Sequence, residues 1–406
     1  MTRAPLDRAA HVARWVVLAS FVGAVAGVLS AAFIEALDWA ARAREGTQWL
    51  IWLLPLAGLA VGSAYHYLGR GLERGSTLII EQIHAHSSWI PVRMSVLIFV
   101  CSVITHVFGG SSGREGAALQ LAAGMTDPVS RRLGLAQHDR SIMLVAAVAG
   151  GFGSVFGVPV AGAVFALEVQ RVGRVRHEAI VPAFVASFVG DGIVRAIGTG
   201  HTRFPAVPTF SWDVWLAARL VLLGIIGGLT AMLFVRLTHG VRGVLARWVP
   251  WYPGRAAVGG AVVAALVLVL GWREYSGLSV HLASNAFGGS VEGDSWAKLL
   301  LTSVTIGSGV VGGEFIPLFV TGALMGAGLA DIIGADVPLF AMAGSLAVLA
   351  GATNTPLAML VLGIELFGGP GAVVFAVVCV AAYASSGHAG IYHAQPVAAH
   401  KSGLRD

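Results

Sequence analysis

The chain has 406 residues, of which 56% are hydrophobic and only 12% are charged, and its mean hydropathy is +0.79. Globular proteins average about 45–50% apolar and about 25% charged residues, so a soluble domain of this size cannot bury so much apolar surface. The composition excludes a disordered chain and a secreted disulfide scaffold, and it indicates an all-α protein embedded in a lipid bilayer. The net charge of +5 is small and the basic residues flank apolar runs, so we expect no nucleic-acid partner.

Apolar runs follow one another along nearly the whole chain. In order they cover Trp15–Ile34, Leu50–Tyr67, Val92–Phe108, Ser141–Leu167, Ile180–Ile197, Val214–Leu237, Ala256–Leu270, Leu299–Ile306, Phe315–Ile333, Leu339–Leu349, Leu357–Leu366 and Ala372–Ala382. A helix needs about 20 apolar residues to span a bilayer, and several of these runs are shorter. We therefore expect about a dozen membrane elements, several of them too short to cross alone.

The positions of basic residues predict how the chain is oriented in the membrane. Arg3, Arg8 and Arg14 precede the first apolar run, which places the N-terminus in the cytoplasm of a multi-pass protein of the cell inner (plasma) membrane. The basic loops Arg131–Arg140 and Arg171–Arg176 and the tail Lys401–Arg405 are expected on the same side. We expect one transmembrane transport domain over residues 1–406, with no soluble regulatory domain.

Two matched motifs indicate an internal repeat. Gly110-Ser-Ser-Gly-Arg-Glu115 corresponds to Gly309-Val-Val-Gly-Gly-Glu314, and Pro159–Glu168 corresponds to Pro356–Glu365 at a nearly equal offset. The repeat predicts two halves, roughly residues 14–200 and 213–395. Glycine-broken apolar segments at equivalent places in two halves are typical of a transporter's binding site.

The glycine segments can serve anion binding. A helix that begins inside the membrane after Gly109–Gly113 or Gly307–Gly313 presents free backbone N–H groups and the positive end of its dipole. Glu115 and Glu314 stand at these two helix starts. A carboxylate there imitates an anion and withdraws when protonated, which links anion and proton occupancy. The structural alternative is a glutamate that only serves its own helix N-terminus.

At these residues the chain resembles the CLC chloride channel and transporter family. Gly113-Arg-Glu-Gly116, Gly312-Gly-Glu-Phe-Ile-Pro317, Pro159–Glu168 and the late tyrosine of Ser386–Tyr392 carry the resemblance, in order and over the whole transmembrane domain. The resemblance implies a CLC-type inverted-repeat bundle of many tilted, partly broken helices, a homodimer with a separate anion pathway in each subunit, and no enzymatic activity.

The resemblance also assigns roles to residues. Glu115 matches the gating glutamate, and Tyr392 matches the tyrosine whose hydroxyl donates to the central anion. The first family signature is degraded here to Gly75–Ile79, in which Ser76, with Thr77 beside it, best matches the central serine. The anion-binding residues expected from the matched segments are Tyr392, Ser76, Thr77, Gly113, Arg114, Gly313, Phe315 and Ile316, and the gating and proton residues are Glu115 and Glu314.

One residue departs from the pattern of the family, and this difference bears on the transport mechanism. Chloride/proton exchangers of the family usually carry a second, inner glutamate at the position of Val169, and valine cannot hold a proton. The chain is therefore either a passive channel or an exchanger that uses another proton route. Ala352-Thr-Asn-Thr-Pro356, Gly363–Phe367 and Ser386-Gly-His388 resemble the fluoride-exporting bacterial branch, whose members lack the inner glutamate and still exchange protons. Phe315-Ile316, by contrast, is closer to the chloride-type signature.

The sequence thus predicts halide transport, with fluoride/proton antiport that exports fluoride as the first hypothesis. The alternative is a chloride channel or chloride/proton exchanger of the same fold. A membrane enzyme or a permease for organic solutes is a further alternative, but no nucleophile, metal or acid–base cluster is evident. The expected partners are a halide ion, a proton, the lipid bilayer and a second copy of the chain. We expect no cofactor and no metal site. For Glu314, a helix cap that never touches the ion is the structural alternative.

Overall fold

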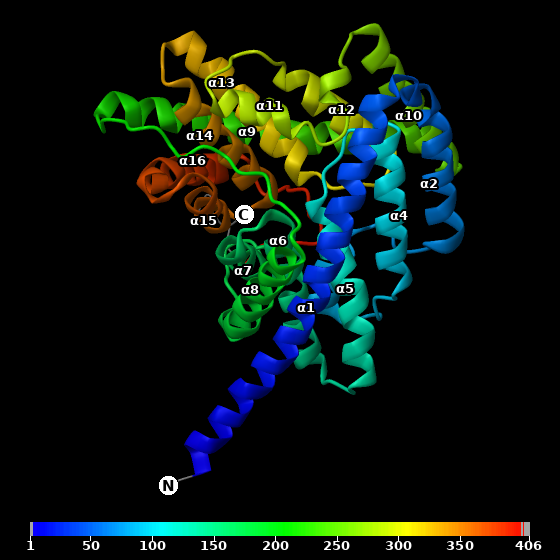
Figure 1. Ribbon diagram of the computed structural model, residues 1–406, viewed down its shortest axis with the longest axis vertical. Coiled ribbons are helices and arrows are strands. Elements are labelled where there is room, and N and C mark those ends of the chain that lie inside the picture. The colour runs from blue at the N-terminus through cyan, green and yellow to red at the C-terminus, as the bar shows by residue number, and fades with distance from the viewer. Residues whose placement is uncertain (1–2, 399–400, 402–406) are drawn as a thin grey trace.

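The computed structural model describes residues 3–398 and residue 401, and the chain folds into an all-helical bundle (Figure 1). The side chains of Arg3 and Arg8 and the tail residue Arg405 lie outside the described part. The helices are α1 (Arg3–Gly46), α2 (Leu54–Leu68), α3 (Ser76–Ala85), α4 (Arg93–Val107), α5 (Glu115–Arg132), α6 (Gln137–Phe156), α7 (Pro159–Glu168), α8 (Ile180–Ile197), α9 (Val214–Trp248), α10 (Tyr252–Val269), α11 (Val280–Phe287), α12 (Ser295–Gly307), α13 (Phe315–Ile333), α14 (Val337–Thr353), α15 (Pro356–Phe367) and α16 (Ala372–Ser385), with short 3₁₀ turns η1 (Gln48–Leu53), η2 (His177–Ala179), η3 (Arg273–Tyr275) and η4 (Gly369–Gly371).

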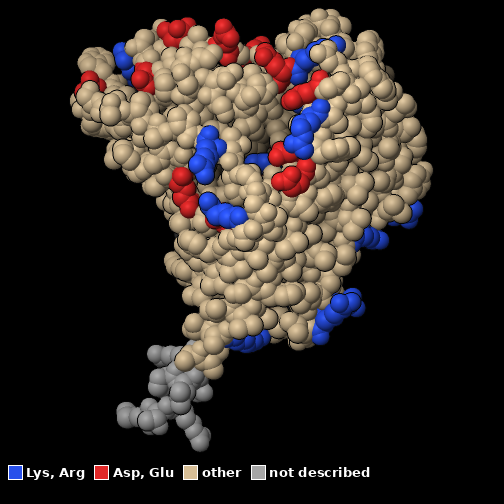
Figure 2. Space-filling view, in the orientation of Figure 1, with Lys and Arg blue, Asp and Glu red and all other residues tan. Residues whose placement is uncertain are grey.

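Among the described residues, seven helical segments are long and apolar enough to cross a bilayer, including most of α1, α6, α9 and α13. Others, such as α7 and α15, are apolar but shorter than a full span. Figure 2 shows basic but no acidic side chains on the lower part of the visible face, toward the N-terminus, whereas the visible acidic side chains lie on the upper half.

Helices from distant parts of the chain pack together. α1 packs along α8, and α7 packs against α15 (Figure 1). In both halves two long helices precede a short one and a longer one: α5 to α8 have 18, 20, 10 and 18 residues, and α13 to α16 have 19, 17, 12 and 14.

Two glutamates join α7 and α15 reciprocally. The carboxylate of Glu168, at the end of α7, accepts hydrogen bonds from the backbone N–H groups of Leu357 and Ala358 at 3.1 and 2.7 Å. Glu365 of α15 likewise accepts from Val160 and Ala161 at 3.0 and 2.6 Å. Each glutamate therefore satisfies N–H groups that the first turn of the other helix leaves without an intrahelical partner. Both carboxylates are occupied by helix capping.

The longest apolar run is divided in the structure. Ser141–Leu167 was expected as one segment, but α6 ends at Phe156 and α7 begins at Pro159. Gly157 between them has a φ of 74°, a left-handed conformation that glycine adopts without a steric penalty. Pro159 then starts α7, where its missing N–H is not needed.

Three helices were missed by the search for apolar runs, namely α3, α5 and α11. α5 shows the reason, since its sequence is rich in small and polar residues yet most of its side chains are buried. Gly124 lies against Ser95 of α4 and allows close approach of the two helices. A helix enclosed by other helices need not be apolar throughout, because its environment is protein rather than lipid.

A buried ion pair fixes the junction of α5 and α6. Arg140 donates from Nε and Nη2 to the two carboxylate oxygens of Asp127, both at 2.7 Å, and both residues are buried. Arg140 also donates to the carbonyl of Ser88 at 2.6 Å and lies 4.2 Å from the ring of Trp89. The backbone N–H of Ile90 donates to Asp127 at 2.7 Å. The pair thus holds the connection between α3 and α4.

Asp127→Ala is expected to lower the free energy of unfolding by about 3–5 kcal/mol, because Arg140 is then left as an uncompensated buried charge. Unfolding in mixed detergent–SDS micelles measures the loss. The double variant Asp127→Leu/Arg140→Met is the control, since replacing both charges by apolar groups should restore much of the stability. An Asp127→Ala variant as stable as the wild type would contradict a structural role for the pair.

Candidate anion-binding site

The starts of α5 and α13 meet at a pair of glycines. Gly113 donates to the carbonyl of Gly313 at 2.6 Å, and Gly313 donates back to Gly113 at 2.8 Å. A Cβ on Gly113 would lie 2.9 Å from the side chain of Pro317, and one on Gly313 would lie 3.0 Å from the backbone of Gly113. Only glycine permits this approach, which places the positive ends of two helix dipoles side by side.

Glu115 occupies the space at this junction. Its Oε2 accepts hydrogen bonds from the backbone N–H of Arg114 at 3.1 Å and of Ile316, on the other half of the chain, at 3.3 Å. The residue is 1% exposed. The carboxylate therefore lies where the free N–H groups of a helix start can bind an anion, as the gating role predicts.

Two polar atoms at the site have no hydrogen-bond partner among the described residues. They are Oε1 of Glu115 and Nε of Arg114, which form an ion pair 3.7 Å apart, too far for a hydrogen bond. Unsatisfied buried polar atoms are costly, and at a transport site such atoms are available to an ion, a proton or water.

Glu314 directly follows Gly313 of the Gly113–Gly313 pair. It stands at the N-cap of α13, but its side chain makes no capping hydrogen bond. It faces a cavity of about 610 Å³ that Ser76, Thr77 and Tyr392 also line. The carboxylate of Glu314 thus lines the cavity without a capping hydrogen bond.

Tyr392 is buried between this cavity and an aromatic cluster. Its ring centroid is 6.2 Å from that of Phe165, and Phe165 in turn stacks on Phe152 at 4.4 Å. Phe315 packs edge-on against Phe152 and Phe156, at 5.1 Å from each. The side chain of Phe315 therefore supports the site, whereas Ile316 contributes its backbone N–H.

Ser76 and Thr77 start α3 at the same cavity. The Ser76 hydroxyl donates to the carbonyl of Gly116 at 3.1 Å, so it is engaged with the first turn of α5. Gly75, before it, has a φ of 55°. The degraded signature therefore brings the expected serine to the site, with its hydroxyl proton held by the backbone.

Several cavity residues were missed by sequence reasoning. Arg242 of α9 lines the cavity together with Arg74, Arg255 and His393. Arg242 follows a long apolar run, where a basic residue is explained equally well by membrane topology. Its place beside an anion path depends on the packing of α9 against α12, which no local pattern reveals.

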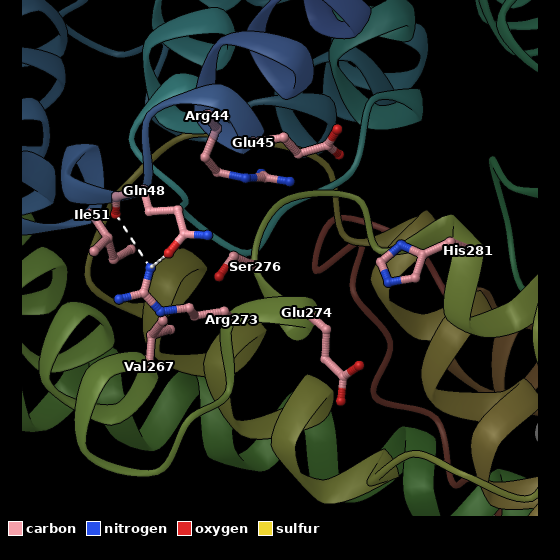
Figure 3. A pocket seen from close by; sticks show the side chains of 9 residues that line it. All are labelled: Arg44, Glu45, Gln48, Ile51, Val267, Arg273, Glu274, Ser276 and His281. Carbon is pink, nitrogen blue, oxygen red and sulfur yellow. Dashed lines mark hydrogen bonds between the residues drawn. The ribbon is translucent and has the colours of Figure 1, made fainter.

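A second cavity, of about 310 Å³, lies at the end of α1 away from the N-terminus (Figure 3). Its charged residues have both signs, with Arg44 and Glu45 from α1 and Arg273 and Glu274 from η3. Arg273 donates to the carbonyl and to the side-chain oxygen of Gln48 at 3.5 and 3.1 Å (Figure 3). Its mixed charge and its distinct set of lining residues separate it from the cavity at Glu314.

Within residues 3–398 and at residue 401, no group of three or more His, Cys, Asp or Glu side chains is arranged to hold a metal ion. Val169 is buried at the end of α7 and offers only its backbone to hydrogen bonding.

The apolar helices, and the two helix starts that converge at Gly113 and Gly313, are the arrangement of a multi-pass membrane protein with a candidate anion site. The family model described as voltage-gated chloride channel matches residues 57–387. The chain therefore belongs to the CLC family, and it is a membrane transporter of halide ions rather than an enzyme.

Individual proteins and solved structures are similar to this chain over most of its length. A chloride/fluoride channel protein of Pseudomonas syringae pv. tomato is 40% identical over 97% of this chain and 88% of its own length. The crystal structure of a CLC-type fluoride/proton antiporter superposes with a TM-score of 0.92 at 29% identity, covering 95% of this chain and 98% of the other. A slow cyanobacterial Cl⁻/H⁺ antiporter, with a TM-score of 0.77 and 18% identity over 93% of this chain and 96% of its own, shares the fold.

Proposed function

We propose that this protein is a fluoride/proton antiporter that exports fluoride. The observation that carries the proposal is the pair of carboxylates, Glu115 and Glu314, at the two helix starts that the Gly113–Gly313 pair joins. Val169 offers no proton site, and Glu314 supplies a titratable group at the cavity instead. The relatives described as a chloride/fluoride channel protein and a fluoride/proton antiporter support this assignment.

Fluoride needs strong hydrogen bonds to replace its tightly held water. The backbone N–H of Ile316 and the hydroxyl of Tyr392 supply such donors, and a protonated Glu115 or Glu314 adds an O–H donor. An ionised carboxylate repels the anion, so the ion and a proton are expected to occupy each glutamate position together. This linkage couples the two fluxes.

Chloride transport by the same fold is the second candidate. Phe315-Ile316 resembles the chloride-type signature, and Ser76 lies at the cavity. A passive channel is the corresponding outcome if no proton moves.

The assembly and orientation belong to the same proposal. We propose a homodimer with one anion path per subunit, a cytoplasmic N-terminus in the inner membrane, and two halves at roughly residues 14–200 and 213–395. The recurring helix order and the reciprocal capping by Glu168 and Glu365 support the two halves. Cross-linking in native membranes tests the dimer.

The decisive experiment uses the purified protein in liposomes loaded with fluoride or chloride, with anion efflux and internal pH recorded together. Fluoride efflux accompanied by proton entry, with little chloride movement, is the expected result. Anion flux without proton movement would mean a channel, and a preference for chloride would place the protein in the second candidate class.

Tyr392→Phe is expected to raise the apparent KM for fluoride by about tenfold or more, because a hydrogen bond to a charged group contributes about 1.5–3 kcal/mol. Initial rates of fluoride efflux at varied fluoride concentration measure the change. Tyr67→Phe, at an exposed tyrosine, is the matched control. An unchanged KM in Tyr392→Phe would remove the hydroxyl from the anion site.

A further inference from the structure

Lysine is almost absent from this chain. Of 26 basic residues only Lys298 and Lys401 are lysines. Lys298, in α12, is fully buried and donates to the carbonyls of Tyr275 and Gly277 and to the hydroxyl of Ser279, at 2.7 to 3.1 Å. It secures the turn between η3 and α11, far along the chain from Tyr392. Lys401 uses its amine in the same way, at a position that bears on transport.

Lys401 joins three segments of the chain. Its Nζ donates to Oδ1 of Asn354 at 2.5 Å, to the hydroxyl of Ser386 at 2.9 Å and to the carbonyl of Gly387. Its backbone N–H donates to Nε2 of His388 at 3.0 Å. The amine also lies 4.1 Å from the ring centre of Tyr383. We call Asn354, Ser386, Gly387, His388, Gln395 and Lys401 the Lys401 node.

The node encloses the segment that carries Tyr392. Asn354, at the junction of α14 and α15, donates from Nδ2 to the carbonyl of His388 at 3.3 Å and to Oε1 of Gln395 at 3.1 Å. His388 precedes Tyr392 and Gln395 follows it, so a single side chain holds both ends of the segment. The segment, red after α16 in Figure 1, lies near the middle of the molecule.

The same node reaches Val169. Gln395 donates from Nε2 to the carbonyl of Val169 at 2.7 Å and to that of Thr353 at 2.9 Å. Asn354 has a φ of 59°, a left-handed conformation that asparagine tolerates better than most residues. The junction is therefore shaped to turn the Asn354 amide toward both Lys401 and the Tyr392 segment.

The chemistry of the node suits lysine. An ammonium group has three donors directed tetrahedrally, which match three separate oxygen acceptors, whereas the flat guanidinium of arginine does not. No ion pair is formed by Lys401 within the described part of the chain, so oxygen dipoles and the ring of Tyr383 stabilise the amine. Burial lowers the pKa of the Lys401 amine to about 8.

We propose that Lys401 is a positioning residue that holds the Tyr392 segment against the α14–α15 junction, so that fluoride cannot move without a proton. This inference rests on the proposed function. With the node intact, the Tyr392 hydroxyl keeps one place in the anion path. With the node broken, the segment shifts and fluoride passes without waiting for a protonated glutamate.

The test compares Lys401→Met, which keeps the length of the side chain but removes its donors, with Lys401→Arg, which keeps the charge but not the tetrahedral geometry. Fluoride and proton fluxes are recorded together in liposomes. We expect Lys401→Met to raise the ratio of fluoride to proton flux by about twofold or more, since small displacements of a positioned group have large effects on rate. Lys401→Arg is expected to restore part of the coupling.

Arg247→Met, at an exposed residue near the end of α9, is the control and should keep the wild-type ratio. If Lys401→Met does not assemble, Ser386→Ala removes one acceptor from the node and is expected to raise the ratio in the same direction. A wild-type flux ratio in a folded Lys401→Met, or in Ser386→Ala where that variant replaces it, would overturn the inference. A wild-type protein that moves fluoride without protons would instead overturn the proposed function, and is recognised before any variant is made.

Discussion

Glu115→Gln is expected to abolish proton movement while the protein remains folded. The glutamine amide has nearly the same shape as the carboxylate, and its oxygen can still accept from the backbone N–H groups of Arg114 and Ile316. It cannot take up or release a proton in the range of cellular pH. The internal pH of fluoride-loaded liposomes should then change no faster than in protein-free liposomes.

The control is Glu292→Gln, at an exposed glutamate in the loop before α12, which should transport protons as the wild type does. The fluoride flux of Glu115→Gln separates two forms of the mechanism. Continued uncoupled flux means that the amide still leaves the anion path, and loss of flux means that it stays bound to Ile316. Wild-type proton flux in Glu115→Gln would remove Glu115 from the proton route.

Glu314→Gln is expected to lower coupled proton flux by about 100-fold or more, the scale on which a positioned proton-transfer group contributes to rate. Val169 leaves no alternative carboxylate at the position of the inner glutamate, and Glu314 makes no capping bond that would commit it to a structural role. Simultaneous recording of fluoride efflux and internal pH measures the change. The apparent KM for fluoride should change less than the proton flux, because Tyr392 and the Ile316 N–H remain.

Asp336 supplies a matched control on the next helix. It caps α14, with its carboxylate accepting from the backbone N–H of Leu339 at 2.8 Å. Asp336→Asn should therefore reduce thermal stability slightly without changing the ratio of fluoride to proton flux. If Glu314→Gln instead reproduced this pattern, with lower stability and intact coupling, Glu314 would be a structural residue and the inner proton route would lie elsewhere.

Arg140 and Lys401 show two different ways in which the protein holds a positively charged side chain. The Arg140 guanidinium is paired with a carboxylate through two parallel hydrogen bonds, the geometry that arginine favours. The Lys401 amine is held by a carbonyl, a hydroxyl and an amide oxygen. The Arg140–Asp127 pair is expected to matter for stability, and the Lys401 contacts for the position of Tyr392.

The sequence by itself determined the class of the protein and the residues at the two helix starts. Composition is a property of the whole chain, and a bilayer tolerates few charged residues, so membrane embedding follows without any knowledge of contacts. The glycine segments before Glu115 and Glu314 are local patterns that recur in both halves, and resemblance of these motifs to the CLC family was confirmed by the family match. The division of Ser141–Leu167 at Gly157 was also locally encoded, although the apolar run concealed it.

Only the tertiary structure decided how these pieces combine. The hydrogen bond from Ile316 to Glu115 joins residues 201 positions apart, and the Gly113–Gly313 pair exists only because two distant helix starts converge. α5 could not be found as an apolar run because it is surrounded by other helices. Arg242 lines the cavity at Glu314 because of the way α9 packs. Local patterns fix where a helix begins and which residue stands there. Contacts between halves depend on close packing across long stretches of chain, which no single segment encodes.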